Sequence, residues 1–130
     1  MNASIPYLIF TGNCREVLNF YKTVFSGEIT LLQTLGESPI PHDPAAAHYI
    51  FNGEMKAGDL VIKASDNLPQ NKTIAGNNFS LFLAIDEPEA QARIFGELAE
   101  GGEIMFPLEH GFGMLRDQYG IQWMLAGKIS

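Results

Sequence analysis

Apolar residues in the first half of the chain follow two spacings, one typical of strands and one typical of a helix. Short apolar, β-branched runs predict strands at 5–10, 28–35, 48–51 and 60–64. A helical spacing joins Cys14, Val17, Leu18, Tyr21, Val24 and Phe25. Asn13 and Glu16 form a predicted capping pair before this helix, and Ser26-Gly27 ends it. Asn52-Gly53 is predicted as a turn, and residues 36–46, with three prolines, as an ordered or semi-ordered loop rather than a helix.

The second half repeats this order of elements. Strands are predicted at 78–85, 103–107, 113–116 and 121–125. The helix between the first two has an apolar face made of Ala90, Ile94, Phe95, Leu98 and Ala99. Asp86 and Glu89 form its predicted start, with Pro88 in the first turn, and Gly101-Gly102 stops it.

The spacing between matching signals indicates an internal duplication. Asn13 and Asp86 are 73 residues apart, as are Glu16 and Glu89. The chain is therefore predicted to be an α+β protein, one domain over 1–130 that consists of a βαβββ module at 1–70 and a second at 76–130.

Composition excludes several classes of protein. Apolar residues make up 46% of the chain and the formal net charge is −7, so a globular core is expected and nucleic acid and anionic membranes are poor partners. No apolar run is long enough to span a membrane, and the N-terminus lacks the features of a signal peptide. The single Cys14 cannot form an intramolecular disulfide, which favours a cytoplasmic location.

Two motifs give the sequence a resemblance to a known family. They are Asn19-Phe20-Tyr21 with Phe25-Ser26-Gly27, and FGMLRD at 112–117 with Tyr119-Gly120 and Trp123. Together with His48 and the GDLVIKASD segment at 58–66, they resemble the PhnB-like branch of the vicinal oxygen chelate superfamily, which includes glyoxalase I, extradiol dioxygenases and bleomycin-binding proteins. The resemblance implies that the two modules form an open, curved mixed sheet, a cup with helices on its convex side and a small ligand inside. It also implies a homodimer.

The enzymes of that superfamily hold a divalent metal with His, Gln or Glu side chains from the first and last strand of each module. Motif spacing places the four corresponding positions at Pro6, Ile62, Phe79 and Met124. None of these residues is a ligand for Zn²⁺ or Mg²⁺. A shift of one residue gives no better set, because the neighbours are Tyr7, Lys63, Ser80, Trp123 and Leu125. We therefore expect no metal and no other cofactor.

Other candidate residues have competing interpretations. His48 matches a histidine of the PhnB-like branch and either serves binding or proton transfer or bonds a backbone carbonyl. Lys63 and Arg116 are either surface cations or partners of an anionic ligand. Cys14 is expected to be an inert core thiol, and the pairs His42-Asp43 and Glu109-His110 to lie in a solvated loop and a turn.

These observations favour a protein that binds a small apolar or aromatic molecule without a metal. Strand alternation predicts a ligand surface made of Leu8, Phe10, His48, Ile62, Phe79, Leu81 and Met124. The alternative is a metal-dependent lyase or dioxygenase that uses non-standard ligands, such as His48 with Glu28, Glu103 or Glu109.

Overall fold

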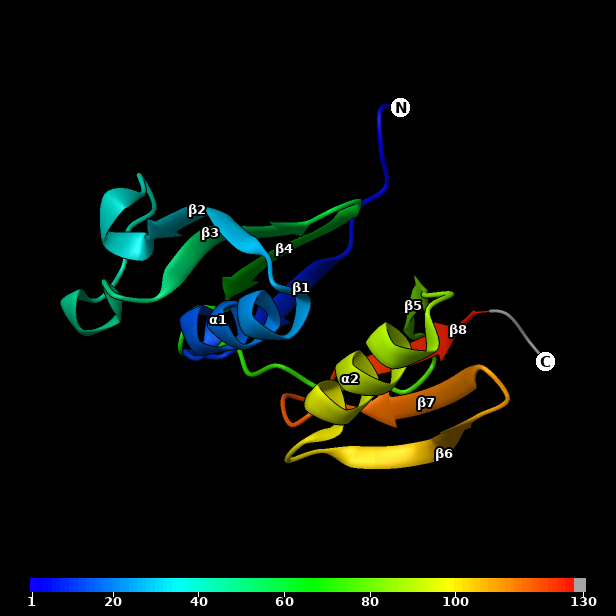
Figure 1. Ribbon diagram of the computed structural model, residues 1–130. Coiled ribbons are helices and arrows are strands. Elements are labelled where there is room, and N and C mark those ends of the chain that lie inside the picture. The colour runs from blue at the N-terminus through cyan, green and yellow to red at the C-terminus, as the bar shows by residue number, and fades with distance from the viewer. Residues whose placement is uncertain (128–130) are drawn as a thin grey trace. The chain divides into compact units, whose positions relative to one another are not determined.

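The computed structural model describes residues 1–127 and divides the chain into two compact units. The first unit is Met1–Ile74, and the second begins at Ala75. Each unit contains four strands and one α-helix in the order βαβββ (Figure 1). Within the described residues, no helix is both long and apolar enough to cross a membrane.

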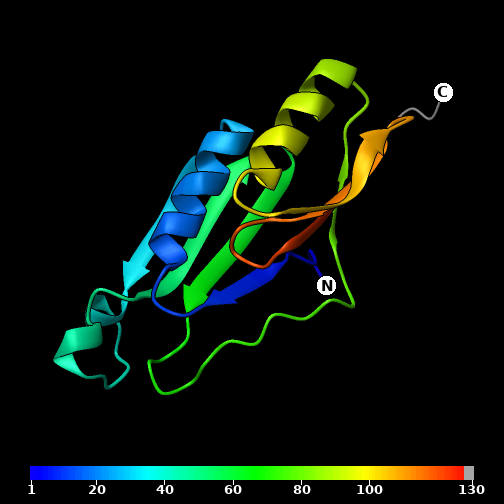
Figure 2. The same cartoon turned by 90° about the horizontal axis from the view of Figure 1, so that it is seen from below.

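The first unit is a four-stranded mixed sheet with one helix across one of its faces (Figure 2). Its elements are β1 (Tyr7–Phe10), α1 (Cys14–Phe25), β2 (Glu28–Thr34), β3 (Ile50–Ala57) and β4 (Leu60–Asp66). The strands lie in the order β1-β4-β3-β2, with β1 parallel to β4 and the other pairs antiparallel. The proline-rich loop contains two short 3-10 turns, Leu35–Glu37 and Pro44–Ala46.

The second unit has the same topology. Its elements are β5 (Leu81–Ala84), α2 (Pro88–Ala99), β6 (Glu103–Glu109), β7 (Phe112–Arg116) and β8 (Gln122–Ala126). The strand order is β5-β8-β7-β6, and β5 is parallel to β8. The predicted α+β class and the repeated βαβββ order are therefore confirmed.

A glycine sets how closely α1 approaches the first sheet. A Cβ atom on Gly53 would lie 2.6 Å from Cδ1 of Leu18 on the helix, closer than two carbon atoms can approach. The prediction of a turn at Asn52-Gly53 is therefore wrong, because both residues lie inside β3. The turn between β3 and β4 lies instead at Gly58, whose positive φ of 56° suits a residue without a side chain.

The N-terminus of α1 is capped by a residue from the far end of the unit. Asn13 occupies the N-cap position and Glu16 the first turn, as predicted, but the side chain of Asn13 does not make the expected capping hydrogen bond. Oδ1 of Asp66 accepts from the backbone N–H of Cys14 at 3.0 Å, and its Oδ2 accepts from that of Ile50 at 2.9 Å. A carboxylate at a helix N-terminus also stabilises the positive end of the helix dipole.

The start of α2 also differs from its prediction. The N-cap position is Glu87 rather than Asp86, and it makes no side-chain capping bond. Pro88 occupies the first turn as predicted. The buried carboxamide of Gln91 donates instead to the carbonyls of Ile85 and Gly111, which ties the helix to β5 and to the β6–β7 turn.

The motif FGMLRD at 112–117, with Tyr119-Gly120 and Trp123, is organised by one buried carboxylate. Asp117 is 3% exposed, and its Oδ1 accepts from the backbone N–H groups of Tyr119 and Ile121 at 2.9 and 3.1 Å. Its Oδ2 accepts from Nε1 of the fully buried Trp123 at 2.9 Å. Asp117 therefore holds both the turn before β8 and the largest side chain of the second core.

We expect Asp117→Ala to lower the free energy of unfolding by about 3 kcal/mol, because it leaves buried donors without an acceptor. Urea denaturation followed by Trp123 fluorescence measures the change. The control is Asp59→Ala in the exposed β3–β4 turn, which should change stability by less than about 0.5 kcal/mol. Equal effects of the two substitutions would contradict the assigned role of Asp117.

Candidate ligand-binding site

The first sheet has one face buried against α1 and one open face. Strand pairing places Leu8, Ala64 and Gly53 side by side, and Gly53 lies against the helix. Leu8, Phe10 and Ile62 belong to this helix face and are at most 5% exposed. The prediction that these three residues line a ligand surface is therefore wrong by one residue along each strand, which exchanges the two faces.

The open face of the first sheet carries the residues that alternate with Leu8, Phe10 and Ile62 along the strands. Tyr7 pairs with Lys63 and Ile9 with Ser65, while Lys63 also pairs with Glu54 on the other side. Tyr7 and Ile9 are 46% and 49% exposed. The open face of this sheet is therefore mixed, with aromatic, aliphatic, hydroxyl and charged side chains.

In the second unit the predicted register of β8 agrees with the structure. Trp123 is fully buried on the face against α2, so Met124 lies on the open face, paired with Met114 and Phe82. Leu81 pairs with Trp123 and so belongs to the helix face, contrary to its prediction as a ligand contact. Phe79 precedes β5 and is 60% exposed.

A pocket of about 570 Å³ lies in the first unit, at the end of the open face where β4 finishes. Its apolar lining includes Tyr7, Leu35, Ile40, Tyr49, Phe51 and Leu68. Its polar lining includes Asn52, Lys63, Ser65, Asn67 and Asn71. The sheet therefore forms the floor, and the proline-rich loop and the segment after β4 form two walls.

Hydrogen bonds fix both walls of the pocket. The N–H of Asn67 donates to the carbonyl of Phe10 at 2.7 Å, which holds the segment after β4. The N–H groups of Leu35 and Gly36 donate to the carbonyls of Tyr49 and Ala47 at 2.7 and 2.9 Å, which closes the base of the proline-rich loop. These backbone hydrogen bonds therefore tie both walls to the rest of the first unit.

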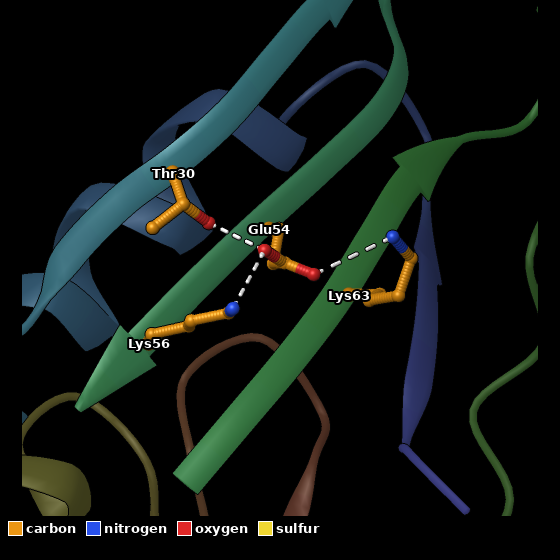
Figure 3. A network of polar contacts seen from close by, with 4 residues as sticks. All are labelled: Thr30, Glu54, Lys56 and Lys63. Carbon is orange, nitrogen blue, oxygen red and sulfur yellow. Dashed lines mark hydrogen bonds and ion pairs between the residues drawn. The ribbon is translucent and has the colours of Figure 1, made fainter. Parts of the chain in front are cut away.

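A charged network lies on the open face of the first sheet (Figure 3), and it reaches the pocket through Lys63. Oε1 of Glu54 accepts from the hydroxyl of Thr30 at 2.6 Å and lies 3.8 Å from Nζ of Lys56, while its Oε2 lies 3.6 Å from Nζ of Lys63. The hydrogen bond from Thr30, helped by the two ammonium groups, holds the pKa of Glu54 below its ordinary value. Of the two lysines, Lys63 also lines the pocket.

The other predicted candidates lie elsewhere. His48 is exposed, contacts the ring of Tyr49 edge-on at 5.1 Å between centroids, and is not part of the pocket lining. Arg116 donates to the carbonyls of Gly76 and Gly120 and to Oε1 of Gln122, which gives it a structural role. Burial raises the pKa of the Cys14 thiol, and the nearby Asp66 carboxylate adds to this, so the thiol stays protonated.

Sequence reasoning missed the polar lining of the pocket. Val61, Lys63 and Ser65 alternate with the buried Ile62 and Ala64 along β4. This alternation indicates which residues share the open face, but the motif spacing of the resembling family placed Ile62 on that face instead. The asparagines of the segment after β4 carried no comparable signal, because a loop has no fixed side-chain period.

The residues present do not fit a divalent metal. On the open faces, the residues at or beside the superfamily's ligand positions include Tyr7, Lys63 and Met124. An ammonium group has no lone pair to donate, and a thioether is a poor ligand for a hard cation. Over residues 1–127, no group of three or more His, Cys, Asp or Glu side chains is arranged to hold a metal ion.

We expect Thr30→Val to raise the pKa of Glu54 toward its ordinary value of 4.5, because the substitution removes the strongest interaction that lowers it. A pH titration of the Glu54 carboxyl by NMR measures the shift. A lowered pKa in the folded state contributes stability above pH 4.5 that is lost as the pH falls through the folded value, so the variant should lose less stability on acidification. Thr23→Val, which removes a hydroxyl that donates to Asn19, is the control and should leave Glu54 unchanged.

Comparison with known proteins places this geometry in a family. The profile described as 3-demethylubiquinone-9 3-methyltransferase matches residues 2–126. Protein YjdN of Escherichia coli strain K12 is 27% identical over 135 residues, which cover 92% of this chain and 91% of that protein.

Solved structures share the fold over nearly the whole chain. Protein PA1353 from Pseudomonas aeruginosa has a TM-score of 0.88 and 32% identity, with 98% of both chains covered. A PhnB protein from Bacillus cereus has a TM-score of 0.76 and 22% identity over 97% of this chain and 99% of that one. The fosfomycin resistance protein FosX from Mesorhizobium loti, at a TM-score of 0.66 and 11% identity over 96% and 90% of the two chains, shares the fold alone. The match over residues 2–126, together with 32% identity to a structure of the same fold, shows that this chain belongs to the family described as 3-demethylubiquinone-9 3-methyltransferase.

Proposed function

We propose that this protein binds a small organic molecule with an apolar or aromatic body in the pocket of its first unit, without a metal. The observation that carries the proposal is the pocket of about 570 Å³ at the end of the open sheet face. Its volume lies within the range of roughly 300–1,000 Å³ that small-molecule sites occupy. Apolar walls with a few polar groups are the usual lining of such sites.

The lining supplies two kinds of interaction. The rings of Tyr7, Tyr49 and Phe51 offer apolar surface for a ring or an aliphatic chain. The carboxamides of Asn52, Asn67 and Asn71 offer donors and acceptors that orient the polar end of a ligand. The family description names a methyltransferase, but the sequence has no glycine-rich nucleotide loop that would hold a methyl donor, so we propose binding and no methyl transfer.

A substitution that fills the pocket tests the proposal. Ser65 lies on the open face of β4 and lines the pocket, so Ser65→Trp should occupy the ligand volume without entering the core. We expect fragments found by a thermal-shift and NMR screen of the wild type to lose at least about tenfold in affinity for this variant, a loss of about 1.4 kcal/mol or more.

The matched control is Val61→Trp. Val61 lies four residues earlier on the same face of the same strand, outside the pocket lining. This variant should bind the same fragments as the wild type does. Fragments that bind Ser65→Trp as tightly as the wild type would refute the pocket as the binding site, and a screen without any pocket binder would refute the proposed function.

We further propose that the protein is a homodimer. Each sheet has two edge strands whose outer sides have no partner strand in that sheet. The open face of the second unit carries apolar side chains such as Phe82 and Phe106, which are 60% and 56% exposed. Pairing with a two-fold mate is the commonest way to cover such surface. Sedimentation equilibrium at micromolar concentration should give twice the chain mass of 14.3 kDa, and a strict monomer would contradict the proposal.

A further inference from the structure

The pocket of the first unit has one cationic group in its described lining, the ammonium of Lys63. This lysine lies on β4 between two neighbours on the open face, Tyr7 on β1 and Glu54 on β3. Its side chain is 29% exposed, so it is neither buried in the core nor extended freely into solvent. An anion that entered the pocket would therefore meet a positioned positive charge beside an aromatic ring.

We infer that the ligand is an organic carboxylate whose anionic group lies against Nζ of Lys63 and whose apolar body lies against Tyr7. This inference rests on the proposed function and names the ligand class of the same pocket. The side-chain N–H groups of Asn52, Asn67 and Asn71 add donors to the ammonium group, a set that suits carboxylate oxygens.

Asp66, the one carboxylate in the described lining of the pocket, does not contradict an anionic ligand. Asp66 accepts from the backbone N–H groups of Cys14 and Ile50, one with each oxygen, and it lies at the N-terminus of α1. Its negative charge is therefore balanced by two backbone donors and by the positive end of the helix. Among the described residues, the carboxylate that contacts Lys63 is that of Glu54, at a longer distance of 3.6 Å.

Glu54 competes with the ligand for Lys63. The distance of 3.6 Å between Nζ of Lys63 and Oε2 of Glu54 is longer than a good hydrogen bond, and the other oxygen of Glu54 already accepts from Thr30. Removing the charge of Glu54 makes the surroundings of Lys63 more positive. Glu54→Gln should therefore strengthen the binding of an anion and leave that of a neutral molecule unchanged.

The experiment compares 2-naphthoate with its neutral analogue 2-naphthamide. Affinities are measured by NMR from the side-chain amide shifts of Asn52, Asn67 and Asn71, in the wild type and in folded variants. We expect the wild type to bind the carboxylate about tenfold more tightly than the amide, a difference of about 1.4 kcal/mol, because a charge-assisted contact is stronger than one between neutral groups. Lys63→Met should abolish this preference and leave binding of the amide unchanged.

Lys56→Met is the matched control. Lys56 contacts the same carboxylate of Glu54 at 3.8 Å but is not part of the pocket lining. This variant should keep most of the preference for the carboxylate, and Glu54→Gln should increase it severalfold. Equal affinity for the two probes, or a preference that survives Lys63→Met, would overturn the inference.

Two patterns of results distinguish a pocket that binds neutral molecules from a pocket that binds no ligand. If the fragment screen yields pocket binders that are blocked by Ser65→Trp, and all of them are neutral, the pocket binds small molecules but the carboxylate assignment is wrong. If neither probe perturbs the three asparagines and the screen yields no pocket binder, both are wrong.

Discussion

The carboxylate of Asp66 connects the three segments on which the candidate site depends. It ends β4, it accepts the N–H of Cys14 at the start of α1, and it accepts the N–H of Ile50 at the start of β3. The helix start, the end of the proline-rich loop and the segment after β4 are therefore held at one point. Because the pocket lies where these segments meet the sheet, its walls depend on a group that contributes stability rather than chemistry.

In the second unit, too, an aspartate carboxylate accepts hydrogen bonds from backbone N–H groups, but there it stabilises a turn and the core. Asp117 stands just after β7, and its carboxylate accepts from two backbone N–H groups and from Nε1 of Trp123. A buried carboxylate is stable only when hydrogen bonds replace its hydration. In this unit, those bonds fix the turn before β8 and the core Trp123, while the open face carries Phe82, Phe106 and Met124.

The open face of the first sheet carries three charged side chains that are connected by ion pairs. Glu54, Lys56 and Lys63 form a network whose contacts are all at or near the surface, so its contribution to stability is small. Its value lies in placing one ammonium group at the edge of a pocket with apolar walls. The contact between Nζ of Lys63 and Oε2 of Glu54, at 3.6 Å, is longer than a good hydrogen bond.

The sequence by itself determined the elements and their order. Helical spacing on the apolar face of 14–25, the short β-branched runs and the glycine stops were enough to predict two βαβββ modules, because these signals are local. The capping bonds predicted from Asn13 and Asp86 were not confirmed. The position of Trp123 and Met124 on opposite faces of β8 also followed from strand alternation.

Only the tertiary structure decided which face of the first sheet is open. Strand alternation divides the residues of a strand into two faces but does not tell on which face the helix packs. The positions inferred from motif spacing were wrong by one residue, so Leu8, Phe10 and Ile62 were predicted on the open face although they lie on the helix face. Asn52-Gly53 has the composition of a turn, yet close approach of Leu18 requires its glycine inside β3. The cap of α1 and the walls of the pocket involve residues such as Asp66 and Asn67, more than 50 positions from Cys14 or Phe10, and no local pattern encodes such contacts.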